Sequence, residues 1–64
     1  MLVGLNVRKH REALCLSQEE LAFKADLHRT YVSGVERGIR NPTVEIVARL
    51  AVALGIKPAH LLES

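Results

Sequence analysis

The chain has 64 residues, of which 48% are hydrophobic and 25% charged, and its nine Lys and Arg residues exceed its seven Asp and Glu residues by two. Such a composition excludes a disordered segment, and the length suits one small globular domain spanning residues 1–64. The single cysteine excludes an internal disulfide and a cysteine-rich zinc framework. The low aromatic content, with no tryptophan, disfavours RNA binding through stacked aromatic side chains.

Neither a leader peptide nor a membrane span is expected. The N-terminus has no basic segment followed by an apolar one, and the longest apolar run, from Ala51 to Ile56, has six residues. We therefore expect a cytoplasmic protein, in a reducing compartment that agrees with the lone cysteine.

No enzyme chemistry, cofactor or metal is expected either. The candidate nucleophiles, Cys15 and Ser33, have no base and orienting group visible in the sequence, and no glycine-rich phosphate loop is present. The side chains that bind metals show no pair at ligand spacing; they are His10, His28, His60 and Cys15.

The first predicted element is a helix from Gly4 to Leu14. One face collects the residues at helical spacing, which are Val3, Val7, His10 and Leu14. Arg8 and Glu12 point away from this face, and Arg11 lies at its margin. Helical periodicity continues along the chain and no segment alternates as a strand does, so the fold class is predicted to be all-α.

The second predicted helix starts after Ser17, which is followed three residues later by Glu20. This spacing predicts a capping box, in which the serine hydroxyl accepts from a backbone amide while the glutamate reaches back. The apolar face of the helix consists of Leu21, Ala22 and Ala25. The helix is expected to end near Ala25, because Asp26 tolerates the left-handed conformation of a tight turn.

The third predicted helix runs from about Arg29 to Arg37, with Gly38 as its C-cap. Val32 and Val35 share one side, which is expected to be buried. The opposite face carries small polar residues and an arginine, namely Thr30, Ser33, Gly34 and Arg37.

A fourth helix is predicted to begin after Thr43, a typical N-cap residue. Its wide apolar stripe consists of Ile46, Val47, Leu50, Ala51 and Leu54, and Gly55 ends it. Pro58 suits the first position of a last short helix, from Pro58 to Leu62.

Two short helices joined by a tight turn thus occupy the middle of the chain, at about residues 18–37. The second helix suits a DNA major groove, because small side chains permit close approach and polar ones read base edges. The stretches LSQEELA (16–22) and RTYVSGVERGIRNPT (29–43) together strongly resemble the XRE family of lambda-repressor-like helix-turn-helix regulators. The resemblance covers Val3 to Leu62 and implies a compact five-helix domain that binds duplex DNA as a dimer.

The resemblance also implies roles for single residues. Positions that match base-contacting ones are Arg29, Thr30, Ser33 and Gly34, and positions that match phosphate-contacting ones are Gln18, Tyr31, Arg37, Arg40 and Asn41. The alternative for both sets is an ordinary solvated surface. We expect Gly34 to allow the helix backbone close to the bases, at a cost in helix stability. Arg11 and Glu36 match a partly buried ion pair of the family; the alternative for Arg11 is a contact with DNA.

A homodimer is implied because one recognition helix contacts few base pairs, so that specificity needs two half-sites about 34 Å apart. The candidate interface consists of Val52, an apolar residue opposite the core stripe of the fourth helix, together with Pro58 and His60. The first functional hypothesis is a sequence-specific transcriptional regulator, such as a phage repressor or a restriction–modification controller. The alternative is an antitoxin or a protein-interaction adaptor with the same fold. A contact with RNA polymerase is left open.

Overall fold

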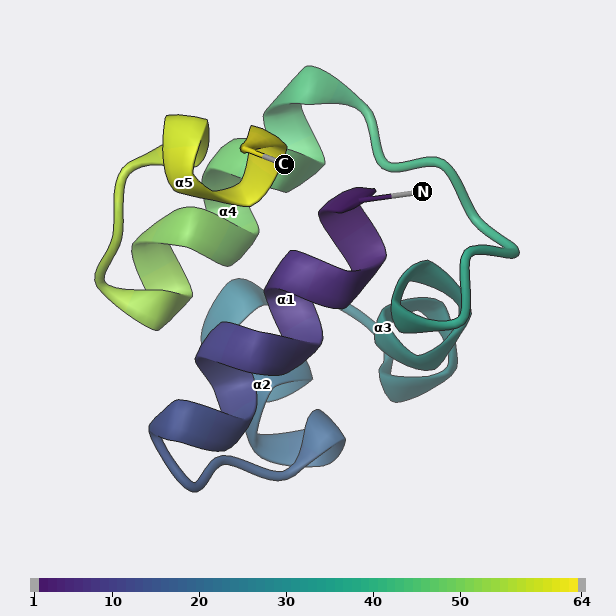
Figure 1. Cartoon of the computed structure of the whole chain (residues 1–64). Coiled ribbons are helices and arrows are strands. Elements are labelled where there is room, and N and C mark those ends of the chain that lie inside the picture. The colour runs from purple at the N-terminus through teal and green to yellow at the C-terminus, as the bar shows by residue number, and fades with distance from the viewer. Residues whose placement is uncertain (1, 64) are drawn as a thin grey trace.

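The computed structural model describes residues 2–63, and all regular structure in that range is helical. The five helices are α1 (Leu2–Ala13), α2 (Gln18–Ala25), α3 (Arg29–Glu36), α4 (Val44–Leu54) and α5 (Pro58–Leu62). They pack into a body of 24 × 23 × 19 Å, in which α1 lies between α5 on one side and α3 on the other (Figure 1). The all-α, five-helix fold predicted from the sequence is therefore confirmed.

Helix ends lie close to where the capping residues predict them. Ser17 and Glu20 form the capping box: the Ser17 hydroxyl accepts from the Glu20 amide at 3.0 Å, and the Ser17 amide donates to the Glu20 carboxylate at 2.8 Å. The Thr43 hydroxyl likewise accepts from the amide of Ile46. Asp26 ends α2 in the left-handed conformation, at φ 56°, which reverses the chain before α3.

A single core joins all five helices. Its fully buried large side chains come from α1, α2, α3, α4 and α5; they are Val7, Leu21, Val32, Val35, Leu50 and Leu61. Each such side chain contributes about 1.5–3 kcal/mol when it leaves water. In the described part of the chain, every helix is too short or too polar to cross a bilayer.

The first helix differs from its predicted form at both ends. It begins at Leu2 rather than Gly4 and ends at Ala13, so Leu14 does not continue the apolar face but is 52% exposed. The reason is the turn that follows, in which Cys15 takes a left-handed conformation at φ 58° and redirects the chain. Leu16, beyond the turn, packs against the core instead.

Two residues of α1 fix its neighbours. Gly4 lies directly against the backbone of α3, and a β-carbon at this position would collide with the carbonyl oxygen of Val35. Asn6 donates from its side-chain amide to the carbonyl oxygens of Leu61 (2.9 Å) and Glu63 (2.7 Å), which ties α5 to α1. As a result the two ends of the described chain lie near each other (Figure 1).

Candidate nucleic-acid interface

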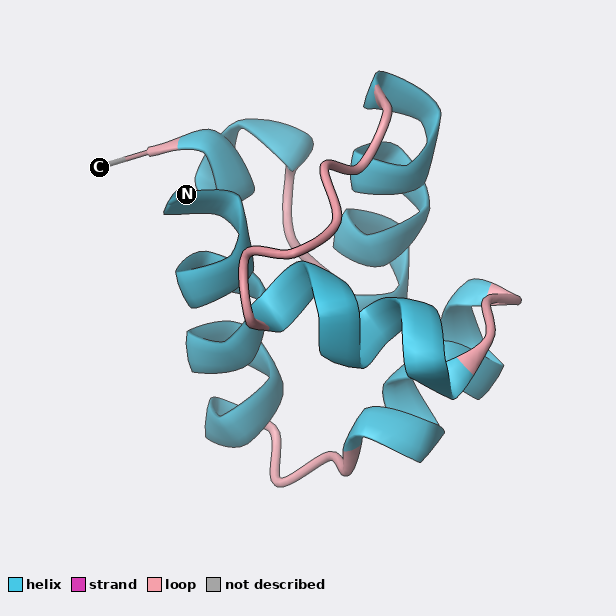
Figure 2. Ribbon diagram, turned by 90° about the vertical axis from the view of Figure 1, so that its right-hand side faces the viewer, coloured by secondary structure: helices cyan, strands magenta, loops and turns pink. Residues whose placement is uncertain are grey.

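The helix pair α2–α3 presents α3 on the surface of the molecule. Figure 2 shows α3 in front, with the 37–43 loop leaving its end and passing up to α4. Val32 and Val35 are 0% and 1% exposed, so the inner side of α3 is sealed against the core. This arrangement fixes which side of α3 can meet another molecule.

The outer face of α3 consists of Arg29, Thr30 and Ser33. Arg29 and Thr30 are exposed in the first turn, and Ser33, one turn further on, is half-buried. His28, the N-cap residue, makes no side-chain capping bond, so the first turn of α3 is not closed by that side chain. Guanidinium and hydroxyl groups are therefore gathered on the outer face of one helix, the kind of element that the DNA major groove admits.

Gly34 lies elsewhere than expected. It is buried, because the amides of Ile39 and Arg40 both donate to its carbonyl oxygen, at 2.9 and 3.1 Å, and so fold the loop back over α3. The Arg40 stem then occupies the place that a Gly34 side chain would take. The prediction that Gly34 forms part of an open face is wrong for the free protein, because sequence spacing does not show this loop closure.

The residues predicted to contact phosphates fall into two groups. Arg37, Arg40 and Asn41 are exposed in and around the loop after α3, which begins with Arg37 as C-cap and Gly38 in the left-handed conformation. The helix therefore ends one residue earlier than expected. Tyr31 differs from these three residues, since it is half-buried and packs against the core.

Arg11 and Glu36 are brought together across α1 and α3. The Arg11 guanidinium donates from Nε and Nη2 to the two carboxylate oxygens of Glu36, at 2.7 and 3.1 Å, and the side chains are only 12% and 3% exposed. The hydrogen bond to Glu36 raises the pKa of Arg11, against the opposing effect of burial. Arg11 also donates from Nη1 to the carbonyl oxygen of Leu16 at 2.7 Å.

Gln18, the first residue of α2, joins this pair. Its side-chain amide donates to Oε1 of Glu36 at 3.1 Å, and the residue is half-buried. A residue predicted to contact a phosphate is thus also in contact with the buried carboxylate.

Comparison with known proteins places this arrangement in a family. The sequence profile of the helix-turn-helix family matches residues 7–61. The chain belongs to the XRE-type helix-turn-helix family. The resemblance seen in the sequence is therefore confirmed.

Individual relatives cover most of the chain. It is 45% identical over 64 residues to the control protein C.BamHI of Bacillus amyloliquefaciens. The aligned region covers 98% of this chain and 79% of C.BamHI. Among solved structures, the restriction–modification controller protein C.AhdI from Aeromonas hydrophila is similar at 49% identity and a TM-score of 0.90, over 92% of this chain and 89% of that one. SinR, the master regulator for biofilm formation, solved in complex with DNA, gives 27% identity and a TM-score of 0.90, over 95% and 98% of the two chains.

Sequence reasoning missed Arg49, which contacts the helix-turn-helix from outside it. From α4 its guanidinium donates to the carbonyl oxygens of Ala25 and Asp26, at the C-terminal end of α2, and lies 3.4 Å from the Asp26 carboxylate. It thereby caps the turn that sets the angle between α2 and α3. The one visible signal was a single arginine in a mostly apolar helix, whose other charged residue is Glu45 in the first turn.

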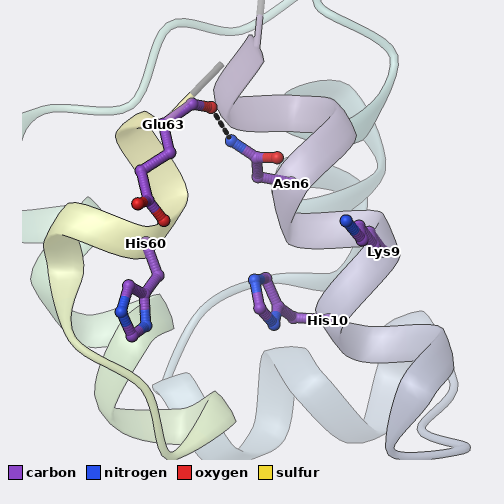
Figure 3. A pocket seen from close by; sticks show the side chains of 5 residues that line it. All are labelled: Asn6, Lys9, His10, His60 and Glu63. Carbon is purple, nitrogen blue, oxygen red and sulfur yellow. Dashed lines mark hydrogen bonds between the residues drawn. The ribbon is translucent and has the colours of Figure 1, made fainter.

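A cleft of about 400 Å³ opens beside the contact between α1 and α5. Its lining residues are Asn6, Lys9, His10, His60 and Glu63. Figure 3 shows the imidazoles of His10 and His60 facing each other across it, a pairing between helices that sequence spacing could not reveal. Over residues 2–63, no three His, Cys, Asp or Glu side chains are grouped to hold a metal ion.

Proposed function

We propose that this protein is a cytoplasmic transcriptional regulator that binds duplex DNA by sequence, with α3 in the major groove. The observation that carries the proposal is the division of α3 into a sealed valine side and an exposed side with Arg29 and Thr30. The named relatives support it, since two are controller proteins and a third has been solved in complex with DNA.

Base recognition is assigned to the outer face of α3. Arg29 suits a bidentate contact with guanine, and the hydroxyls of Thr30 and Ser33 suit contacts with either type of base. Gly34 contributes a base contact only if the Arg40 stem swings away, because that stem covers it in the free protein.

Phosphate contacts flank this face. Arg37 and Arg40 supply charge after α3 and Asn41 a neutral donor, while Gln18 stands at the start of α2. The Tyr31 ring packs against the core, so its hydroxyl is the group that we expect to donate to a DNA phosphate.

We further propose that two copies bind a (pseudo)palindromic operator. Val52 is 79% exposed on α4, and Pro58 and His60 are exposed on α5. A two-fold contact between two copies would remove the Val52 side chain from water, which would account for an apolar residue at this exposed position. Sedimentation with and without operator tests the proposal: dimers are expected on DNA, and a monomer bound to a single half-site would contradict it.

Selection of bound duplexes from a random pool tests the function itself. The expected result is a palindromic consensus whose half-sites are about one helical turn apart. Equal binding to every duplex at low salt would contradict sequence recognition, and no binding to any duplex would favour the alternative of a protein-interaction adaptor.

A further inference from the structure

The Glu36 carboxylate links three helices. It belongs to α3, and it accepts hydrogen bonds from Arg11 of α1 and from Gln18 of α2. With 3% of its side chain exposed, this carboxylate has almost no contact with water and depends on these three donors. Any shift of the carboxylate therefore acts directly on the side chain of Gln18.

This contact decides how the Gln18 amide is turned. A carboxylate only accepts, so Gln18 must direct its NH2 group, and not its carbonyl oxygen, toward Glu36. One N–H is thereby used, at 3.1 Å, and the second has no hydrogen-bond partner among residues 2–63. The amides of the first helical turn also lack partners within the helix, so a donor there is well placed for an anion.

We infer that Glu36 is a positioning residue for DNA binding: it holds the Gln18 amide so that its second N–H donates to a backbone phosphate. The inference rests on the proposed function, because it concerns how one contact to DNA is prepared. Arg11 is the counter-ion of Glu36, and its two donors neutralise a carboxylate that would otherwise repel the phosphate.

The first test is a double-mutant cycle on DNA affinity, using a duplex that carries the selected consensus. Gln18→Ala is expected to weaken binding about five- to tenfold, as loss of one hydrogen bond does. Glu36→Gln should have a similar effect. Its NH2 group either takes the place of the oxygen that accepts from Gln18 and Arg11 Nη2, or faces Arg11 Nε and pushes the side chain out of the position from which it accepts from Gln18. The double variant should be no weaker than either single one. If instead the two effects multiply, Glu36 does not act through Gln18 and the inference is wrong.

Controls separate positioning from charge and from folding. Glu45→Gln, on an exposed first turn of α4, removes the same charge and is expected to leave affinity unchanged or slightly raised. Thermal unfolding of each variant, with binding measured well below the midpoint, shows that the folded protein is compared. A drop in affinity for Glu45→Gln as large as that for Glu36→Gln would overturn the inference.

A second variant does not depend on the stability of Glu36→Gln. Gln18→Asn keeps an amide and leaves the Arg11–Glu36 pair intact, but it is too short to reach Glu36 and a phosphate together. We expect it to bind as weakly as Gln18→Ala; full affinity would contradict positioning. If the unaltered protein binds no duplex, the proposed function fails, whereas unaltered binding by Gln18→Ala refutes only this inference.

The amide signal of Gln18 gives a spectroscopic readout. In the free protein the signal of the NH2 proton that is bonded to Glu36 should be shifted from the position of a solvent-exposed glutamine in nuclear magnetic resonance spectra. Glu36→Gln should shift both, while Glu45→Gln should shift neither. If both NH2 signals of the unaltered protein lie at the positions of a solvent-exposed glutamine, the inference is wrong.

Discussion

Arg49 of α4 caps the turn at Asp26, because the Arg49 guanidinium donates to the carbonyl oxygen of Asp26. The same guanidinium bonds to Ala25, so one side chain satisfies two carbonyls that the end of α2 leaves without helical partners. The accompanying carboxylate of Asp26 is fully exposed, so the ion pair itself adds little. The helix-turn-helix angle is therefore held from outside the motif, by α4.

Replacing Arg49 measures how much this cap contributes to the free energy of unfolding. Arg49→Met keeps much of the stem and removes both carbonyl contacts, and we expect a loss of about 1–3 kcal/mol of stability. For a domain of this size, each kcal/mol lowers the melting temperature by about 4–8 °C. The matched control is Asp26→Asn, which removes only the exposed charge and should change little. Equal melting temperatures for Arg49→Met and the unaltered protein would contradict the capping role.

Two glycines inside helices offer a matched pair of substitutions. At Gly4 an added β-carbon collides with the Val35 carbonyl oxygen of the neighbouring helix, whereas at Gly34 it meets the Arg40 stem. Backbone cannot yield without moving α1 from α3, so Gly4→Ala should cost about 1–3 kcal/mol despite its gain in helix propensity. Gly34→Ala should cost less, because an exposed arginine can turn away. Chemical unfolding of both variants checks this order, and the reverse order would refute the packing of α1 on α3.

These glycines also mark what the sequence could predict. The burial of Val32 and Val35 is predictable because helical periodicity is a local signal. The capping box of Ser17 and Glu20 is predictable because it lies within four residues. Gly4 against Val35, Asn6 against Leu61 and Gly34 beneath Arg40 are contacts made by folding the chain back on itself. No periodicity encodes such pairs, so they needed coordinates.

The capping box makes stability depend on pH in a defined direction. The hydrogen bond from the Ser17 amide lowers the pKa of Glu20 below its ordinary value. Because the folded pKa is below the unfolded one, this contribution is complete above the unfolded pKa, near 4.3, and is lost as the pH falls through the folded value.

Glu20→Gln should therefore be less stable than the unaltered protein at pH 7, and the difference should shrink toward pH 3. Ser17→Ala should cost about 1 kcal/mol at neutral pH. Thermal melts from pH 3 to pH 7 measure both. A difference between Glu20→Gln and the unaltered protein that grows on acidification would contradict the sign of the shift.

Thr30 and Arg37 are both exposed, on and just after α3, but we expect Thr30 to recognise a base and Arg37 to bind a phosphate. Thr30→Ala removes a hydroxyl from the outer face of α3, so it should cost about 1–3 kcal/mol on the selected duplex and relax preference at one base position. Arg37→Ala removes a phosphate contact, so it should weaken selected and random duplexes alike and flatten the plot of log affinity against log salt by about 0.9. Titrations on both duplexes at several salt concentrations measure the two effects. If the variants lose the same affinity on both duplexes with the same change of slope, Thr30 does not read a base, and the outer face of α3 serves only to anchor the backbone.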